Sequence, residues 1–105
     1  MSKEFWNERY TTNESVYGSK PNIFFRDQLN RLAPGKLLLP AEGEGRNAVH
    51  AAIQGWAVDA FDYSSVAKEK ALQRASSHLV TIKYWTDDIE SIRLPMATYD
   101  AIALI

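Results

Sequence analysis

The chain has 105 residues, 46% of them hydrophobic and 11% aromatic, which suits one domain with a packed core and argues against disorder throughout. Its 12 basic and 13 acidic residues give a net charge of −1, which argues against nonspecific binding to nucleic acid or to anionic membranes. The sequence has no cysteine, and no apolar run approaches the roughly 18 residues of a membrane span. We therefore expect a soluble cytoplasmic protein that has neither nucleic acid nor a membrane as its partner.

The first twenty residues mix aromatic and charged side chains without a clear period. They predict an aromatic N-terminal segment, which either packs against the core or closes as a lid that keeps water out of a site. Pro21 and Asn22 then open a helix that ends before the turn pair Pro34-Gly35. The predicted apolar face of this helix is Phe24, Phe25, Leu29 and Leu32.

A strand, a glycine loop and a helix follow in direct succession. The three leucines at 37–39 predict a short strand buried on both faces, and the loop after it contains Gly43 and Gly45. The next helix ends at Gly55. Its predicted inward residues are Val49, Ala52 and Ile53. In open α/β sheets the turn between such a strand and helix holds the ligand, and glycine lets the backbone approach that ligand closely.

Residues 56–61 alternate as a second strand, with Asp62 at its carboxyl end. Ser64 or Ser65 can cap a third helix that runs to about Ala75. The residues expected to face inward from this helix are Val66, Ala67, Ala71 and Leu72. The third strand is predicted to comprise Leu79, Val80, Ile82 and Tyr84.

Residues 99–105 are the most apolar segment and predict a fourth strand buried on both faces. The order of elements predicts an α/β fold, a partial Rossmann-like, doubly wound parallel sheet truncated after its fourth strand. Because a strand of this kind needs neighbours and helical cover, we expect a fragment or a chain completed by another chain. A homo-oligomer paired through the exposed fourth strand is one form of the second case.

The loop sequence from Gly43 to Ala48 fits G-x-G-x-x-G/A, and Asp62 follows about twenty residues later, as in a dinucleotide fingerprint. The local charge argues against a dinucleotide, because its pyrophosphate would lie beside Glu42 and Glu44. A cationic ligand suits the same place. S-adenosylmethionine carries a sulfonium and an ammonium, and its ribose hydroxyls suit a carboxylate such as Asp62.

Two strings, EGEGRNA at 42–48 and GWAVDAFDYSS at 55–65, resemble class I S-adenosylmethionine-dependent methyltransferases. The resemblance is to the tellurite-resistance-related, thiopurine-methyltransferase-like branch in particular. The aromatic string FWNERY at 5–10 and the string AKEKA at 67–71 resemble the same branch. The resemblance extends over essentially the whole chain as a single domain, with residues 1–20 as the lid segment and 21–105 as the cofactor-binding core. It implies a strand order of 3-2-1-4, with helices on both faces of the sheet.

The resemblance also implies which residues around the loop bind S-adenosylmethionine. Gly43 and Gly45 would face the methionine part of the cofactor, Asp62 would bind the ribose hydroxyls, and Tyr63 would lie against the adenine. Each position has a simpler interpretation as well. Asp62 can be a turn-forming residue at the end of a strand, and Glu42 and Glu44 can be solvated acids near a helix N-terminus.

Four further cofactor contacts are implied elsewhere in the chain. Asp88 and Ile89 match the family's acid–hydrophobe pair after the third strand, where the acid meets the adenine amino group. Asp88 can alternatively cap the segment that follows. Tyr10 and Tyr17 would close over the cofactor from the N-terminal segment.

The sequence departs from the family at the end of the first strand. Leu39 stands where the family usually carries an acid, and Pro40 and Ala41 replace its usual leucine and glycine. We hypothesise that Glu42 takes over the contact with the amino end of the cofactor. The C-terminal half of the family, which holds much of the acceptor site, has no counterpart in these residues.

The predicted function is methyl transfer to a small, soft nucleophilic acceptor. We assign no catalytic base, because an acceptor that is already anionic needs none, and His50 and His78 lack the spacing of a metal site. Two alternatives remain at this point: an NAD(P)-binding Rossmann oxidoreductase, and an inactive or oligomerising remnant.

Overall fold

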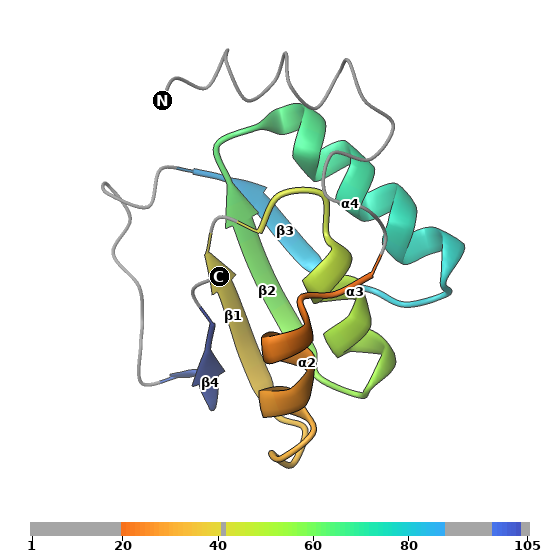
Figure 1. Cartoon of the computed structure of the whole chain (residues 1–105). Helices are drawn as coiled ribbons and strands as arrows, with labels where there is room; N and C mark the ends of the chain where they lie inside the picture. Colours follow the sequence, from red (N-terminus) through yellow and green to blue (C-terminus); the bar gives the residue numbers. More distant parts are fainter. Residues whose placement is uncertain (1–19, 41, 88–97, 104–105) are drawn as a thin grey trace.

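Four parallel strands form a sheet in the order β3-β2-β1-β4 (Figure 1). The computed structural model describes residues 20–40, 42–87 and 98–103. Along the chain the elements are α2 (Ile23–Leu29), β1 (Lys36–Pro40), α3 (Arg46–Ile53), β2 (Ala57–Asp62), α4 (Ser65–Ser77), β3 (Lys83–Thr86) and β4 (Ala101–Ile102). The predicted parallel α/β sheet and its strand order are confirmed.

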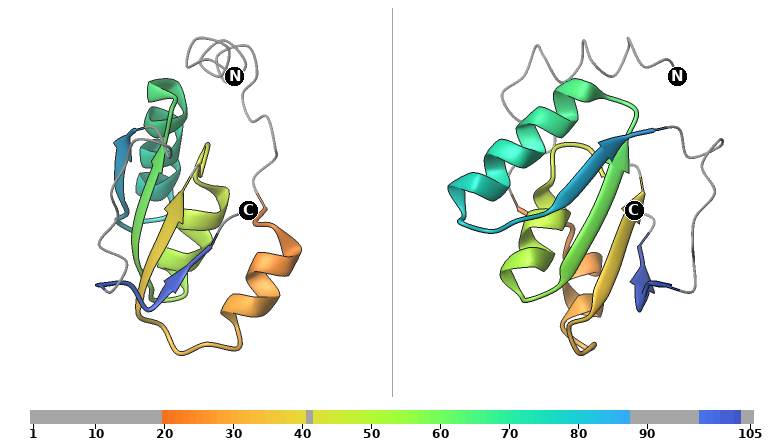
Figure 2. Two further views of the ribbon diagram at one scale, coloured as in Figure 1. Left: turned by 90° about the vertical axis from the view of Figure 1, so that its left-hand side faces the viewer. Right: turned by 180° about the vertical axis from the view of Figure 1, so that it is seen from behind.

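The three described helices cover one face of the sheet, as the side-on view in Figure 2 shows. Every second residue of a strand points toward the helices, because side chains alternate between the two faces of a sheet, and the residues that do so here are apolar. Leu37 and Leu39 of β1 face the helices together with Val58 and Ala60 of β2. The described residues therefore contain the helical layer of one face of a doubly wound sheet.

Small side chains hold α4 close to the rest of this layer. Ala67, Ala71 and Ala75 recur every four residues on one side of the helix, and all three are buried. Ser64 caps the helix, since its side-chain oxygen accepts a hydrogen bond from the Ala67 N–H at 3.1 Å. The predicted capping serine is thus Ser64, and Ser65 is the first helical residue.

Several predicted inward residues of the helices are instead exposed. In α2 only Phe25 and Leu29 are buried, and Phe24 is 72% exposed because it lies a quarter turn away from their stripe. The helix ends at Leu29, so the exposed Leu32 lies beyond its last turn. The prediction is also wrong for Ile53, at the last residue of α3, and for Leu72, which lies beside the alanine stripe of α4.

The third strand is shorter than predicted. Leu79 is 93% exposed and has a φ of 58°, in the left-handed region, so it belongs to the turn between α4 and β3. Ile82 is buried before the strand begins at Lys83, and Tyr84 is buried within it. The described part of the fourth strand is also short, and Ala101 and Ile102 are only partly buried where they pair with Leu37 and Leu38.

On the face of the sheet away from the helices, the Phe61 and Trp85 rings stack with their centroids 5.3 Å apart.

No helix in the described residues is long and apolar enough to cross a membrane.

Candidate functional site

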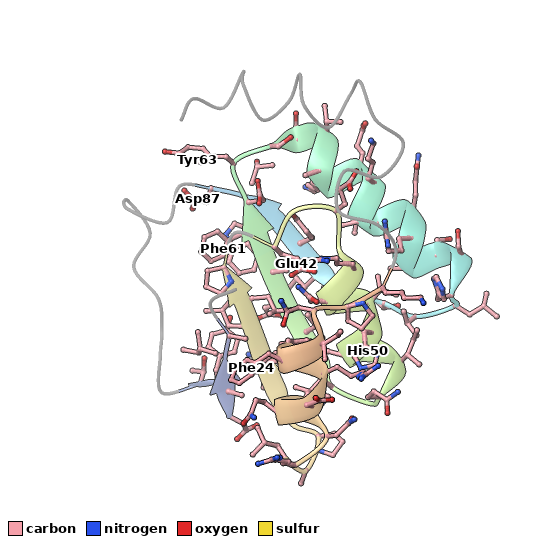
Figure 3. The ribbon with its side chains drawn as sticks, viewed as in Figure 1. Phe24, Glu42, His50, Phe61, Tyr63 and Asp87 are labelled. Atoms are coloured by element: carbon pink, nitrogen blue, oxygen red, sulfur yellow. The ribbon has the colours of Figure 1, made fainter. Side chains whose placement is uncertain are left out.

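The carboxyl ends of the three strands β1, β2 and β3 lie at one edge of the sheet. The pairing of Pro40 with Phe61 and of Asp62 with Thr86 places these ends side by side. Glu42, Tyr63 and Asp87 all lie near this edge (Figure 3). Open parallel sheets bind their ligands at such an edge, so this is the candidate site.

Backbone hydrogen bonds fix the loop between β1 and α3. The Glu42 N–H donates to the Phe61 carbonyl at 3.0 Å, and the Gly43 carbonyl accepts a hydrogen bond from the Tyr84 hydroxyl at 2.6 Å. Gly43 has a φ of 74°, a conformation that side chains rarely adopt. The loop is therefore held from both β2 and β3. The sequence predicted Tyr84 only as a residue of the third strand and gave no sign of this contact, although a buried phenol hydroxyl usually has a hydrogen-bond partner.

Asp62 connects the two loops of the site. One carboxylate oxygen accepts from the Gly43 N–H at 2.9 Å, and the other accepts from the Ser64 N–H at 3.1 Å. Burial raises the pKa of Asp62, and hydrogen bonds from these amides and from the Tyr63 amide oppose that rise. A carboxylate has about four lone-pair positions and these amides take three of them, so Asp62 can still accept from one hydroxyl group of a ligand while it holds both loops.

Glu42 is buried and bonded to the start of α3. The residue is 9% exposed, and one carboxyl oxygen accepts from the Ala48 N–H at 2.7 Å. Burial is the main influence on this group and raises its pKa to about 8; hydrogen bonds from the Ala48 and Asn47 amides lower the pKa, as does the nearby charge of Arg46. The interpretation of Glu42 as a solvated loop acid is therefore wrong, because the chain folds the side chain inward onto the helix.

Glu44 is also buried, at 4% exposure, and its carboxylate lies 3.2 Å from the Lys70 ammonium of α4. It therefore ties the loop to α4 and is not a solvated acid.

Gly45 owes its place to packing against α4. It precedes the first residue of α3 with a φ of 88°, and a Cβ built on it would lie 2.7 Å from the Ala71 Cβ and 2.9 Å from the Ala71 Cα. Real Cβ atoms do not come so close to other atoms. The two glycines of the loop thus have different tasks, since Gly45 permits a helix contact while Gly43 shapes the edge of the site.

The structure brings five predicted cofactor residues together at this edge: Glu42, Gly43, Gly45, Asp62 and Tyr63. Their contacts with a cofactor stay predictions. Four others, Tyr10, Tyr17, Asp88 and Ile89, lie outside the described residues.

Asn47 is a residue of the site region that sequence reasoning missed. Its side-chain oxygen accepts from the Asn22 N–H at 2.8 Å and so joins the start of α2 to α3. The signal was the polar Asn47 within the apolar pattern of the helix.

Among the described residues, no three His, Asp or Glu side chains gather as a metal site. His50 lies on α3, where burial and the charge of Arg26 lower its pKa. His78 follows α4, with its Nδ1 2.9 Å from the Arg74 carbonyl oxygen.

No protein-family model and no curated protein matches this sequence. Solved structures do match. The S-adenosylmethionine-dependent methyltransferase of Thiobacillus denitrificans, in complex with S-adenosyl-L-homocysteine, aligns over 100% of this chain and 44% of its own, with a TM-score of 0.76 and 18% identity. The fold is that of the Rossmann-like methyltransferases.

Two further structures have the same fold. The magnesium protoporphyrin IX methyltransferase of Synechocystis, with bound S-adenosylhomocysteine, gives a TM-score of 0.74 at 18% identity, over 97% of this chain and 55% of its own. TehB of Haemophilus influenzae gives 0.71 at 19% identity, over 97% of this chain and 33% of its own. This chain therefore spans about half or less of the length of these three structures.

Proposed function

We propose that this chain is the cofactor-binding part of an S-adenosylmethionine-dependent methyltransferase. The observation that carries the proposal is the carboxylate of Asp62, held at the end of β2 by the Gly43 and Ser64 amides. It lies at the edge of the sheet where this fold binds its ligands. The lone-pair position that remains on Asp62 can accept from a ribose hydroxyl.

The rest of the site suits the other parts of the same cofactor. Gly43 leaves the loop backbone without a side chain where the methionine part of the cofactor would lie, and Tyr63, next to Asp62, provides an aromatic ring for the adenine. We further propose that Tyr10 and Tyr17 close over the cofactor and that Asp88 and Ile89 contact its adenine. Two of the three structures described above contain S-adenosylhomocysteine, which supports the choice of cofactor.

The bound cofactor supplies a methyl group that is activated by its attachment to a sulfonium. When the methyl group is transferred, the rest of the cofactor leaves as a neutral thioether. The protein's task is then to align the acceptor and to exclude water. We propose a small, soft nucleophile as the acceptor and name no catalytic base. The likeness to TehB and the string AKEKA at 67–71 favour the tellurite-resistance-related branch.

The proposal is tested by isothermal titration of the chain with S-adenosylhomocysteine and, in parallel, with NADH. We expect the first to bind and the second not to bind. Binding of NADH alone would support the oxidoreductase alternative and refute the proposal. A folded chain that binds neither ligand would contradict the proposal for these 105 residues.

The Asp62→Ala variant tests the assigned contact. Because hydrogen bonds to a charged group contribute about 1.5–3 kcal/mol, we expect its affinity for S-adenosylhomocysteine to fall roughly 10- to 150-fold. Asp27→Ala is the matched control, since Asp27 is an exposed acid on α2. Circular dichroism and urea unfolding of both variants separate loss of the contact from loss of the fold. Equal affinities in two folded variants would remove Asp62 from the binding site.

A further inference from the structure

The first turn of α3 has an unusual cap. The first N–H groups of a helix have no partner within it, and the residue before the helix usually satisfies them with a side-chain oxygen. In α3 that residue is Gly45, which has no side chain. Glu42, three residues earlier, supplies the oxygen instead, and its carboxyl group accepts from the Ala48 N–H and is also bonded by the Asn47 N–H.

These amides are the ones that bind phosphate in other proteins of similar topology. In dinucleotide-binding folds the pyrophosphate lies at the N-terminus of the helix after the first strand, on free backbone N–H groups. Here the N–H groups at the same helix end are already bonded to the carboxyl group of Glu42. The carboxyl group of Glu42 thus occupies the place of a phosphate.

The Glu42 side chain has little freedom to leave this place. The Glu42 N–H is bonded to the Phe61 carbonyl, and both backbone polar groups of the next residue are bonded, the Gly43 N–H to Asp62 and the Gly43 carbonyl to Tyr84. The side chain is itself buried. An incoming phosphate would therefore have to displace a buried acid from a loop that β2 and β3 hold on both sides.

We propose that Glu42 is the specificity-determining residue of this site: by capping α3 from within the chain, it excludes phosphate-bearing nucleotides and leaves the site to ligands that lack a phosphate there. The inference rests on the proposed function, because it explains how a dinucleotide-like glycine loop rejects dinucleotides.

Exclusion by Glu42 depends on occupancy more than on charge. With a pKa of about 8, the group is largely protonated at neutral pH, so repulsion between carboxylate and phosphate is weaker than the sequence suggested. A neutral carboxyl group still has a carbonyl oxygen that accepts from the Ala48 N–H. A glutamine at this position keeps that acceptor, whereas an alanine removes it.

The Glu42→Ala and Glu42→Gln variants therefore form a matched pair. We expect ADP and inorganic pyrophosphate to bind the Glu42→Ala chain at least tenfold more tightly than the parent chain in isothermal titration, and the Glu42→Gln chain to resemble the parent. Glu44→Gln is the control, because Glu44 is a buried acid of the same loop that pairs with Lys70 of α4. It is expected to leave the exclusion of phosphate unchanged.

The inference is overturned if the parent chain binds ADP, if a folded Glu42→Ala chain gains no affinity, or if Glu42→Gln gains as much as Glu42→Ala. Should Glu42→Ala fail to fold, the parent chain still provides a test by nuclear magnetic resonance. Its Ala48 amide signal should stay in place when pyrophosphate is added, and a saturable shift would refute the inference.

Titration of all four chains with S-adenosylhomocysteine keeps the two proposals apart. If S-adenosylhomocysteine does not bind to the parent chain, the proposed cofactor is refuted. The ADP and pyrophosphate titrations would still test the role of Glu42. Binding of S-adenosylhomocysteine together with ADP to the parent chain would refute only the role of Glu42.

Discussion

Replacing Gly45 by alanine tests whether the contact between the loop and α4 requires glycine. Two costs add at this position. The φ of 88° places an L-residue in a left-handed conformation, at about 1–2 kcal/mol. The new Cβ would also lie 2.7 Å from the Ala71 Cβ, and overpacking of this kind costs about 1–3 kcal/mol. We therefore expect Gly45→Ala to lower the free energy of unfolding by about 2–5 kcal/mol.

Gly55 offers a matched control. Its φ of 97° carries the same kind of backbone cost, but the nearest atoms to an added Cβ belong to Pro34, at an ordinary 3.8 Å. Gly55→Ala should cost only about 1–2 kcal/mol. The difference between the two variants isolates the packing cost, which we expect to be about 1–3 kcal/mol.

Urea unfolding followed by circular dichroism measures both variants against the parent chain. Equal destabilisation by Gly45→Ala and Gly55→Ala would refute the packing argument.

Two further results are expected from the same unfolding assay. Ser64→Ala should lower the free energy of unfolding by about 1 kcal/mol, because it removes the cap of α4. Ser65 is the exposed first residue of that helix, so Ser65→Ala should change the free energy of unfolding by less than about 0.5 kcal/mol. Equal effects of the two changes would contradict the capping assignment. The pKa of Glu42 is raised from 4.5 to about 8 in the folded chain, so the folded chain binds this proton more tightly than the unfolded chain does. The contribution of protonated Glu42 to stability is therefore full below pH 4.5 and is lost as the pH rises to about 8. The slope in this window should approach about 1.4 kcal/mol per pH unit, and Glu42→Gln should remove it; an unchanged slope in that variant would show that Glu42 does not titrate in this range.

The sheet could be predicted from the sequence because its signals are local. Three consecutive leucines at 37–39, with Gly35 before them and Pro40 after them, indicate a short buried strand. Asp62 stands at the end of the alternating segment that forms the second strand. The capping serine at the start of α4 was likewise readable as one of two neighbours. Local patterns of this kind need no knowledge of distant contacts.

The incorrect predictions concern properties that arise only when elements pack together. Phe24 and Phe25 are chemically identical neighbours, and only the position of α2 on α3 decides which one is buried. Leu79 has a strand-like side chain but adopts the turn that reverses the chain after α4. Gly45 has no side chain to accept from the first N–H groups of α3, and the carboxyl group of Glu42, three residues earlier, accepts from the Ala48 N–H. The inward position of Glu42 therefore follows from the fold around the loop.

The hydrogen bond from the Tyr84 hydroxyl to the Gly43 carbonyl has a consequence for recognition. With it and the bonds to Phe61 and Asp62, the loop at the edge of the sheet has its shape before any ligand arrives. A ligand that fits this shape loses little affinity to the ordering of the loop, and one that needs a wider loop must first break bonds to two strands. The shape of the loop then decides which ligands bind at this edge, together with the chemistry of its side chains. A substitution in β3 that removes the Tyr84 hydroxyl would change that shape and so change which ligands bind.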